Sequence, residues 1–236
     1  MNDRFFITTL PRYSMIIYII LNIMAMLMYA GGNMNDHSQE GYSLIRNFFS
    51  DLGRRYSFAG DSNLISCVLF NSSLTVVGLT FMTLFYKVRL IFPDNKFLIF
   101  IATFFGVYSG FSYIGVGFTP ADLYLEAHIF FAHWAFRALF AASILYSILI
   151  FRTDGFENKY AYAFIIFGIM VFCYVIYSEV VLDDPRDNPA SLIKHVVAQK
   201  MVVFWILFAV YIYSVGASKY LRLLERMYLE KRESKE

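Results

Sequence analysis

Six long runs of predominantly apolar residues divide the chain, and they limit its fold more than any other feature of the sequence. They cover residues 12–30, 64–86, 97–117, 127–151, 160–182 and 196–217. Each run matches the ~20 residues that an α-helix needs to cross the hydrocarbon core of a bilayer. Lipid offers no partner for backbone N–H and C=O groups, so a spanning segment must satisfy them internally. The sequence therefore predicts an all-α, polytopic membrane protein with six transmembrane helices.

The composition supports a bilayer environment and argues against a soluble protein. Of the 236 residues, 58% are hydrophobic and only 16% are charged. The net charge of +2 is small, and the basic residues form no patch interleaved with exposed aromatic residues, so we expect no nucleic-acid partner. Cys67 and Cys173 both lie within apolar runs and are predicted to be free thiols.

The segments outside the six runs predict two further helices. The first is GYSLIRNFFSDLG in the loop after the first run, where residues 42–50 could form a short interfacial helix with one apolar side. The second is the charged tail at residues 218–236, which we expect to form a helix outside a transmembrane domain at residues 1–217. Within the third run, Gly106, Gly110 and Gly115 predict close approach of a neighbouring helix.

The distribution of lysine and arginine predicts the orientation, because cytoplasmic loops carry an excess of both residues. Thirteen of the 20 lie at the two termini and in the loops after the second and fourth runs. Six lie in the remaining loops or at their edges, and Arg137 lies within the fourth run. We therefore predict a multi-pass protein of the cell (cytoplasmic) membrane with both termini in the cytoplasm.

The segment FTPADLYLEAHIFFAHWAFR, residues 118–137, carries ionisable groups into the fourth apolar run. Glu126, His133 and Arg137 follow each other at spacings of seven and four, so they share one side of a helix. Burying a charge in the hydrocarbon region costs about 2.5–3.5 kcal/mol even on lenient insertion scales. Arg137 is therefore predicted to face the interior of the bundle.

The polar residues near the outer face predict a pocket between the second, fourth, fifth and sixth spans. A metal site there is disfavoured, because His128 and His133 are five residues apart, about 140° around a helix, and no HExxH motif is present. A haem would need histidines at matching depth on facing helices, so we predict neither a metal nor another cofactor. The candidate ligand-binding residues are Asp51, Asn71, Asp122, Glu126, His128, His133, Arg137, Glu179 and His195.

Two stretches of the sequence carry a family resemblance. GYSLIRNFFSDLG, followed by LFNSSLTVVG, contains an N-x-x-S-D-L-G turn and an F-N pair ahead of a glycine-bearing second span. GVGFTPADLYLEAH leads from a G-x-F loop with an aspartate to a histidine at the start of the fourth span. Together they resemble an uncharacterised prokaryotic six-helix membrane family, the domain-of-unknown-function family 998. The resemblance implies no particular reaction and singles out Asn47, Ser50, Asp51, Gly53, Asn71, Asp122 and His128.

Three functions are compatible with these features. The first is binding or transport of a small amphipathic or anionic ligand in the outer polar pocket, because a membrane-embedded arginine with nearby carboxylates suits a polar head group. The second is a membrane-embedded hydrolase or transferase that acts on lipid. The third is an accessory subunit held by another membrane protein. The sequence alone does not decide whether the protein is an enzyme.

Overall fold

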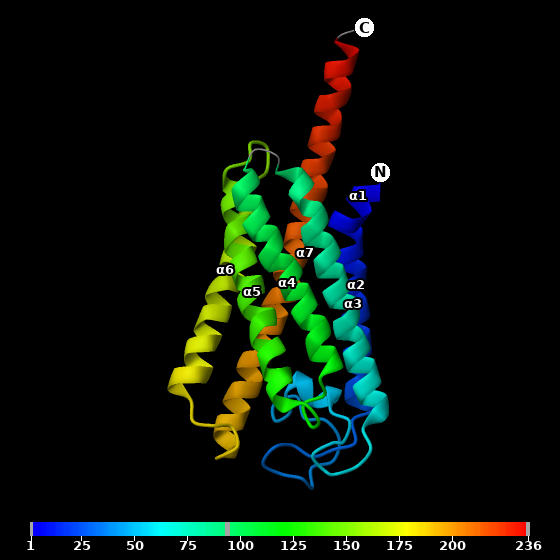
Figure 1. Cartoon of the computed structure of the whole chain (residues 1–236), viewed down its shortest axis with the longest axis vertical. Helices are drawn as coiled ribbons and strands as arrows, with labels where there is room; N and C mark the ends of the chain where they lie inside the picture. The colour runs from blue at the N-terminus through cyan, green and yellow to red at the C-terminus, as the bar shows by residue number, and fades with distance from the viewer. Residues whose placement is uncertain (1, 93–94, 235–236) are drawn as a thin grey trace.

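The computed structural model describes residues 2–92 and 95–234, except for the side chains of residues 2, 178 and 179. Six of its helices are long and apolar enough to cross a membrane, which confirms the predicted all-α, polytopic fold (Figure 1). Within the described ranges, the only other regular structure is an isolated bridge between Tyr56 and Ser62. The helical elements are α1 (Asn2–Arg4), η1 (Phe5–Thr9), α2 (Leu10–Leu27), η2 (Phe49–Gly53), α3 (Leu64–Val88), η3 (Arg89–Ile91), α4 (Lys96–Phe118), α5 (Leu125–Phe151), α6 (Lys159–Ile176), η4 (Tyr177–Val181) and α7 (Pro189–Glu233).

The six long helices form a closed ring in chain order. Each packs mainly against the helix before it and the helix after it, and α7 returns to contact α2. The chain termini lie at one end of this ring, which we call the terminal end, and the loops after α2, α4 and α6 lie at the other, the loop end (Figure 1). Buried aromatic side chains pack in the core, including Phe85, Tyr113, Tyr146 and Tyr213 of the helices and Phe156 of the loop between α5 and α6.

Helices α3 and α4 approach closely through two glycines. A Cβ atom added to Gly110 would lie 2.6 Å from the backbone oxygen of Gly78, and one added to Gly78 would lie 2.5 Å from the backbone oxygen of Gly110. Gly106 similarly packs against the ring of Phe85. These contacts agree with the close approach that the glycines of the third run predict, because small residues let the backbones of membrane helices touch.

The short helix expected at residues 42–50 does not form as predicted. Residues 44–46 form a turn, and the helix that does form is the 3-10 helix η2, which begins only at Phe49. The side chain of Asn47 explains the difference, since its Oδ1 accepts a hydrogen bond from the backbone N–H of Ser43 and its Nδ2 donates to the carbonyl of Gly32. Asparagine side chains that bind nearby backbone groups in this way compete with helical hydrogen bonds.

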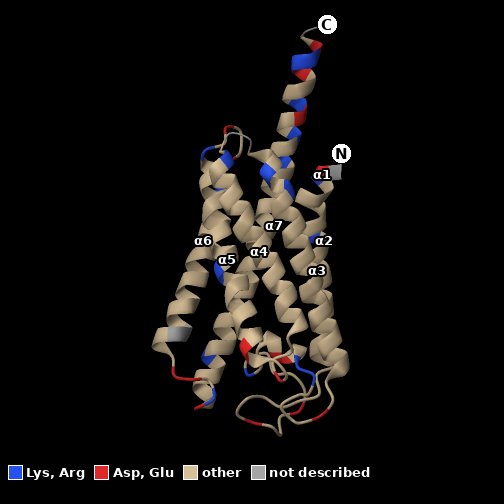
Figure 2. Cartoon of the chain, viewed as in Figure 1, with Lys and Arg blue, Asp and Glu red and all other residues tan. Residues whose placement is uncertain are grey.

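Helix α7 joins the sixth span and the tail into one helix of 45 residues. At about 1.5 Å per residue it is much longer than a bilayer core requires, and its end projects beyond the bundle (Figure 1). Figure 2 shows charges of both signs along this projection. Every described residue from Arg222 onward is exposed. The tail is thus a continuation of α7 rather than a separate element.

Helix α6 packs closely against its neighbours only toward the terminal end. Its buried residues begin at Tyr160 and end at Val171, and no described side chain from residue 172 to 181 is buried. Figure 1 shows the loop end of α6 leaning away from α5 and α7. This side of the ring is therefore more open near the loop end than near the terminal end.

Candidate functional site

Asp122 connects two loops at the loop end of the bundle. Its Oδ1 accepts a hydrogen bond of 2.9 Å from the backbone N–H of Arg55, and its Oδ2 accepts one of 2.8 Å from that of Tyr56. The carboxylate thus fixes the segment after η2 to the loop between α4 and α5. In this structure the side chain of Asp122 binds the backbone of another loop, whereas the sequence suggested that it binds a ligand.

We predict that Asp122→Asn destabilises the protein by roughly 1–3 kcal/mol, because one N–H loses its acceptor and faces an amide NH₂ instead. Chemical unfolding in detergent measures this change. The control is Asp61→Asn, which alters an exposed carboxylate in the same loop region and should leave stability unchanged. Equal stability of the Asp122 variant and wild type would show that the two contacts contribute little.

Asp51 is buried at the centre of the first loop. Its Oδ2 accepts hydrogen bonds from Asn47 Nδ2 at 3.1 Å and from the backbone N–H of Phe48 at 2.9 Å. Burial raises the pKa of Asp51 to about 6, although the Asn47 hydrogen bond and the positive charge of Arg54 act in the opposite direction. Asp51 is only 5% exposed, so its carboxyl group belongs to the internal packing of the loop and is not accessible to a diffusing ligand.

Two α7 residues that the sequence analysis did not single out hold this loop against the bundle. Lys200 donates a 2.5 Å hydrogen bond from Nζ to the carbonyl oxygen of Asn47, and its ammonium lies 5.4 Å and 5.0 Å from the ring centroids of Tyr42 and Phe49. Gln199 accepts a 3.0 Å hydrogen bond from the backbone N–H of Phe49. Lysine within the first turns of a span is a weak sequence signal, because such residues commonly reach the interface.

Three other candidate residues also bind the protein's own atoms. His128 Nδ1 lies 2.7 Å from the carbonyl oxygen of Thr119, and His195 Nε2 lies 3.1 Å from that of Asp183. Asn71 Nδ2 donates to Cys67 Sγ at 3.2 Å. Both histidines are buried. The two histidines therefore fasten helix ends to loops, whereas the bond between Asn71 and Cys67 lies within α3.

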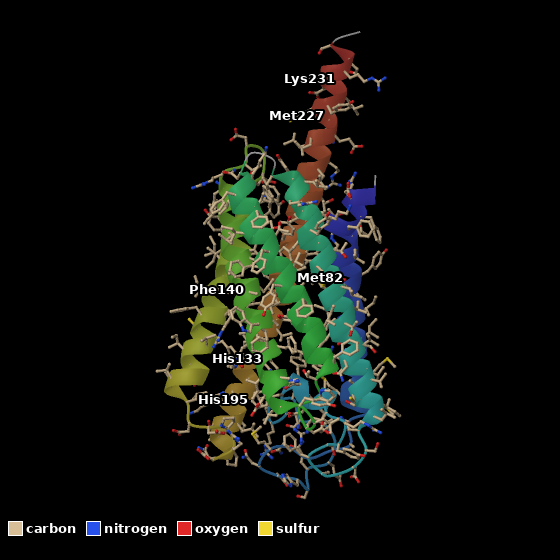
Figure 3. All side chains as sticks on the ribbon, viewed as in Figure 1. Met82, His133, Phe140, His195, Met227 and Lys231 are labelled. Atoms are coloured by element: carbon tan, nitrogen blue, oxygen red, sulfur yellow. The ribbon has the colours of Figure 1, made fainter. Side chains whose placement is uncertain are left out.

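Glu126, His133 and Arg137 are exposed in the structure. The prediction that Arg137 faces the bundle interior is therefore wrong. His133, Arg137 and Phe140 follow one side of α5 at helical spacing, and Figure 3 shows His133 and Phe140 on the side turned toward α6. The ring of Phe140 packs near Gly168 of α6. Farther toward the loop end α6 leans away, so this side of α5 is not enclosed there.

None of the candidates whose side chains the structure describes lines the cavity described below, and the pocket predicted from the nine remains a prediction. The side chain of Glu179 lies outside the described residues, and its backbone belongs to η4. Buried Asp51 and exposed Arg137 occupy different environments. Among the described residues, no group of three or more His, Cys, Asp or Glu side chains is arranged to hold a metal ion.

The structure instead has a cavity between α2, α3, α4 and α7. It is narrow and encloses about 430 Å³, including the part that is open to the surroundings. Most of the lining is apolar, and three hydroxyl-bearing residues, Ser14, Tyr18 and Tyr113, interrupt it. Tyr113 is only 9% exposed, and its hydroxyl has no hydrogen-bond partner among the described residues. Buried polar groups normally have a partner, so this hydroxyl marks the cavity as a candidate binding site.

Comparisons of the chain with family models, with curated proteins and with solved structures give no match.

Proposed function

We propose that the protein binds an amphipathic membrane molecule in the cavity between α2, α3, α4 and α7. The observation that carries this proposal is a narrow apolar space within the span region. One of its lining residues is Tyr113, whose buried hydroxyl has no hydrogen-bond partner among the described residues. Ligand sites are typically concave and apolar with a few polar groups that fix orientation. A hydrocarbon chain is long and thin, so it suits a narrow space of this kind.

The packing of the ring supports entry of such a molecule from the bilayer. Helices α2 and α7 contact each other less than any other neighbouring pair in the ring, and both helices line the cavity through Met15, Tyr18, Val203 and Leu207. The least tightly packed junction of the ring therefore lies beside the cavity. A lipid chain could pass there without disturbing the glycine contact between α3 and α4.

For the cellular location, we propose the cytoplasmic membrane with both termini on the cytoplasmic side. The basis is the excess of lysine and arginine at the end that carries the termini, where Figure 2 shows most of the basic residues outside the spans. We also retain, as a proposal, the resemblance to the domain-of-unknown-function family 998. The six-helix layout is compatible with that resemblance.

A substitution that fills the cavity tests the proposed function. Val77 lines the cavity, whereas Val68 lies on an exposed side of the same helix. We predict that Val77→Phe reduces labelling by a photoreactive C18 fatty ester by at least about fivefold, and that Val68→Phe does not. Labelled peptides identified by mass spectrometry should come from residues around the cavity in wild type. Equal labelling of all three proteins would contradict the proposal.

A further inference from the structure

We propose that a phospholipid with a net negative head group binds in a second hollow, at the terminal end of α3 and α4. The hollow encloses about 480 Å³, including the part that is open to the surroundings, and it shares no lining residue with the cavity described above. The inference therefore goes beyond the proposed function and does not depend on it. The hollow is lined by Arg89 of η3 and by Lys96, Ile99, Phe100 and Thr103 of α4.

The lining of this hollow changes from charged to mainly apolar with depth. Lys96 is the first residue of α4, and Ile99, Phe100 and Thr103 follow it at helical spacing on one side of the helix. At about 1.5 Å per residue, Thr103 lies about 10 Å farther into the span than Lys96. A phospholipid has the same order of groups, because its head group lies at the interface and its acyl chains lie in the hydrocarbon core.

The inner wall of the hollow belongs to the core of the bundle, and its outer wall faces lipid. Ile99 is only 8% exposed, and Thr103 Oγ1 lies 3.4 Å from the hydroxyl oxygen of Tyr146. Phe100 is 71% exposed, so its ring lies on the lipid-facing surface of the span. An acyl chain beside Phe100 therefore covers apolar surface at the edge of the bundle without entering the core.

The two basic residues at the mouth of the hollow have charges available to an anion. Arg89 and Lys96 are both exposed, and neither forms an ion pair with a carboxylate in the described part of the chain. Lys87, which lies nearby in the sequence, differs, because its Nζ binds Asp3 Oδ1 at 2.8 Å. A phosphate at the mouth of the hollow would therefore meet two positive charges that no described acidic residue already neutralises.

The guanidinium of Arg89 stacks on the ring of Tyr86, with 4.1 Å between Cζ and the ring centroid. Stacking occupies the face of the guanidinium and leaves the N–H groups at its edge, whose fork matches phosphate oxygens. A zwitterionic lipid would bring its own ammonium group close to Lys96, so the pair of cations favours a head group with net negative charge. Under the orientation proposed above, this end lies at the cytoplasmic leaflet, which carries anionic lipids.

Two lipids with the same acyl chains test this inference: dioleoyl phosphatidylglycerol, which is anionic, and dioleoyl phosphatidylcholine, which is zwitterionic. Native mass spectrometry of the purified protein, loaded with equal amounts of both, measures the retention of each. We expect wild type to retain phosphatidylglycerol at least about tenfold more than phosphatidylcholine, and Arg89→Gln and Lys96→Gln each to lower this ratio about fivefold, the effect of one basic residue near an anionic surface. The double variant should lose the preference.

Two controls separate this site from general charge effects and from free phosphate. The double variant Arg152→Gln and Arg222→Gln removes the same charge from exposed positions outside the hollow, so it should keep the preference. Excess glycerol phosphate carries the phosphate without the chains and should not displace phosphatidylglycerol from wild type.

Three results would overturn the inference. They are no preference for phosphatidylglycerol in wild type, equal losses in the two double variants, and displacement by glycerol phosphate, which would assign the hollow to a free phosphate instead of a lipid. None of them concerns the cavity between α2, α3, α4 and α7, so the labelling test with Val77→Phe still decides the proposed function by itself.

Discussion

Replacing Gly110 with alanine should destabilise the protein by roughly 3 kcal/mol or more, at the upper end of the cost of overpacking a core. The added Cβ would lie 2.6 Å from the backbone oxygen of Gly78 and 2.8 Å from the backbone nitrogen of Met82, a residue of α3 labelled in Figure 3. Backbone atoms cannot rotate away as a side chain can. The two helices would have to separate and lose packing along their length.

Unfolding in mixed micelles measures this cost, and Gly168→Ala is the matched control. A Cβ at Gly168 would lie 3.3 Å from the ring of Phe140, which is a side chain that can shift by a few tenths of an ångström. We therefore expect little change for the control and a large loss for Gly110→Ala. Similar stabilities of the two variants would mean that α3 and α4 are not held at the distance that the structure shows.

The six spans could be predicted because an apolar run of this length can adopt few backbone structures in a bilayer. A spanning segment must satisfy its backbone internally, so run length alone locates α3, α4 and α5 to within a few residues. The distribution of glycines in the third run added a correct expectation about packing. The same reasoning could not show where the sixth span ends, because a charged helix can continue beyond the membrane as α7 does.

The loop network could not be predicted, because its contacts join residues far apart in the sequence. Lys200 and Asn47 are separated by 153 positions, and Asp122 and Arg55 by 67. The sequence analysis named Asp51 and Asp122 as candidate ligand-binding residues, but it could not show that their partners include backbone N–H groups. A carboxylate that binds a ligand and one that fixes a loop have the same sequence signature when their partners are unknown.

The side of a helix that faces the core was also not fixed by the sequence. Arg137 was placed inside on energetic grounds, yet the lean of α6 leaves that part of α5 exposed. Tyr113 lies in the run FSYIGVG and looks like an ordinary residue of an apolar span. Its importance depends on a missing hydrogen-bond partner, which only the arrangement of α2, α3, α4 and α7 reveals.

The buried carboxyl group of Asp51 should make the protein less stable as the pH rises from about 4 to about 6. Its pKa is raised from 3.8 to about 6, chiefly by burial, while Asn47, Arg54, Phe48 and Lys200 oppose the shift. The folded state therefore holds a proton that the unfolded state releases in this range. The stabilisation is fully present below the unfolded pKa and is lost as the pH passes through the folded pKa. A shift of this size corresponds to roughly 3 kcal/mol.

Asp51→Asn should remove this pH dependence, because the amide is uncharged at every pH and its oxygen can still accept from Asn47 and the Phe48 N–H. We expect the variant to match wild type near pH 4 and to be more stable by up to roughly 3 kcal/mol at pH 7.5. Unfolding in detergent across this range measures the difference, with exposed Asp187→Asn as the control. If Asp51→Asn is less stable than wild type at pH 7.5, the carboxylate is stabilised in the loop by Lys200 and Arg54 more strongly than burial opposes it.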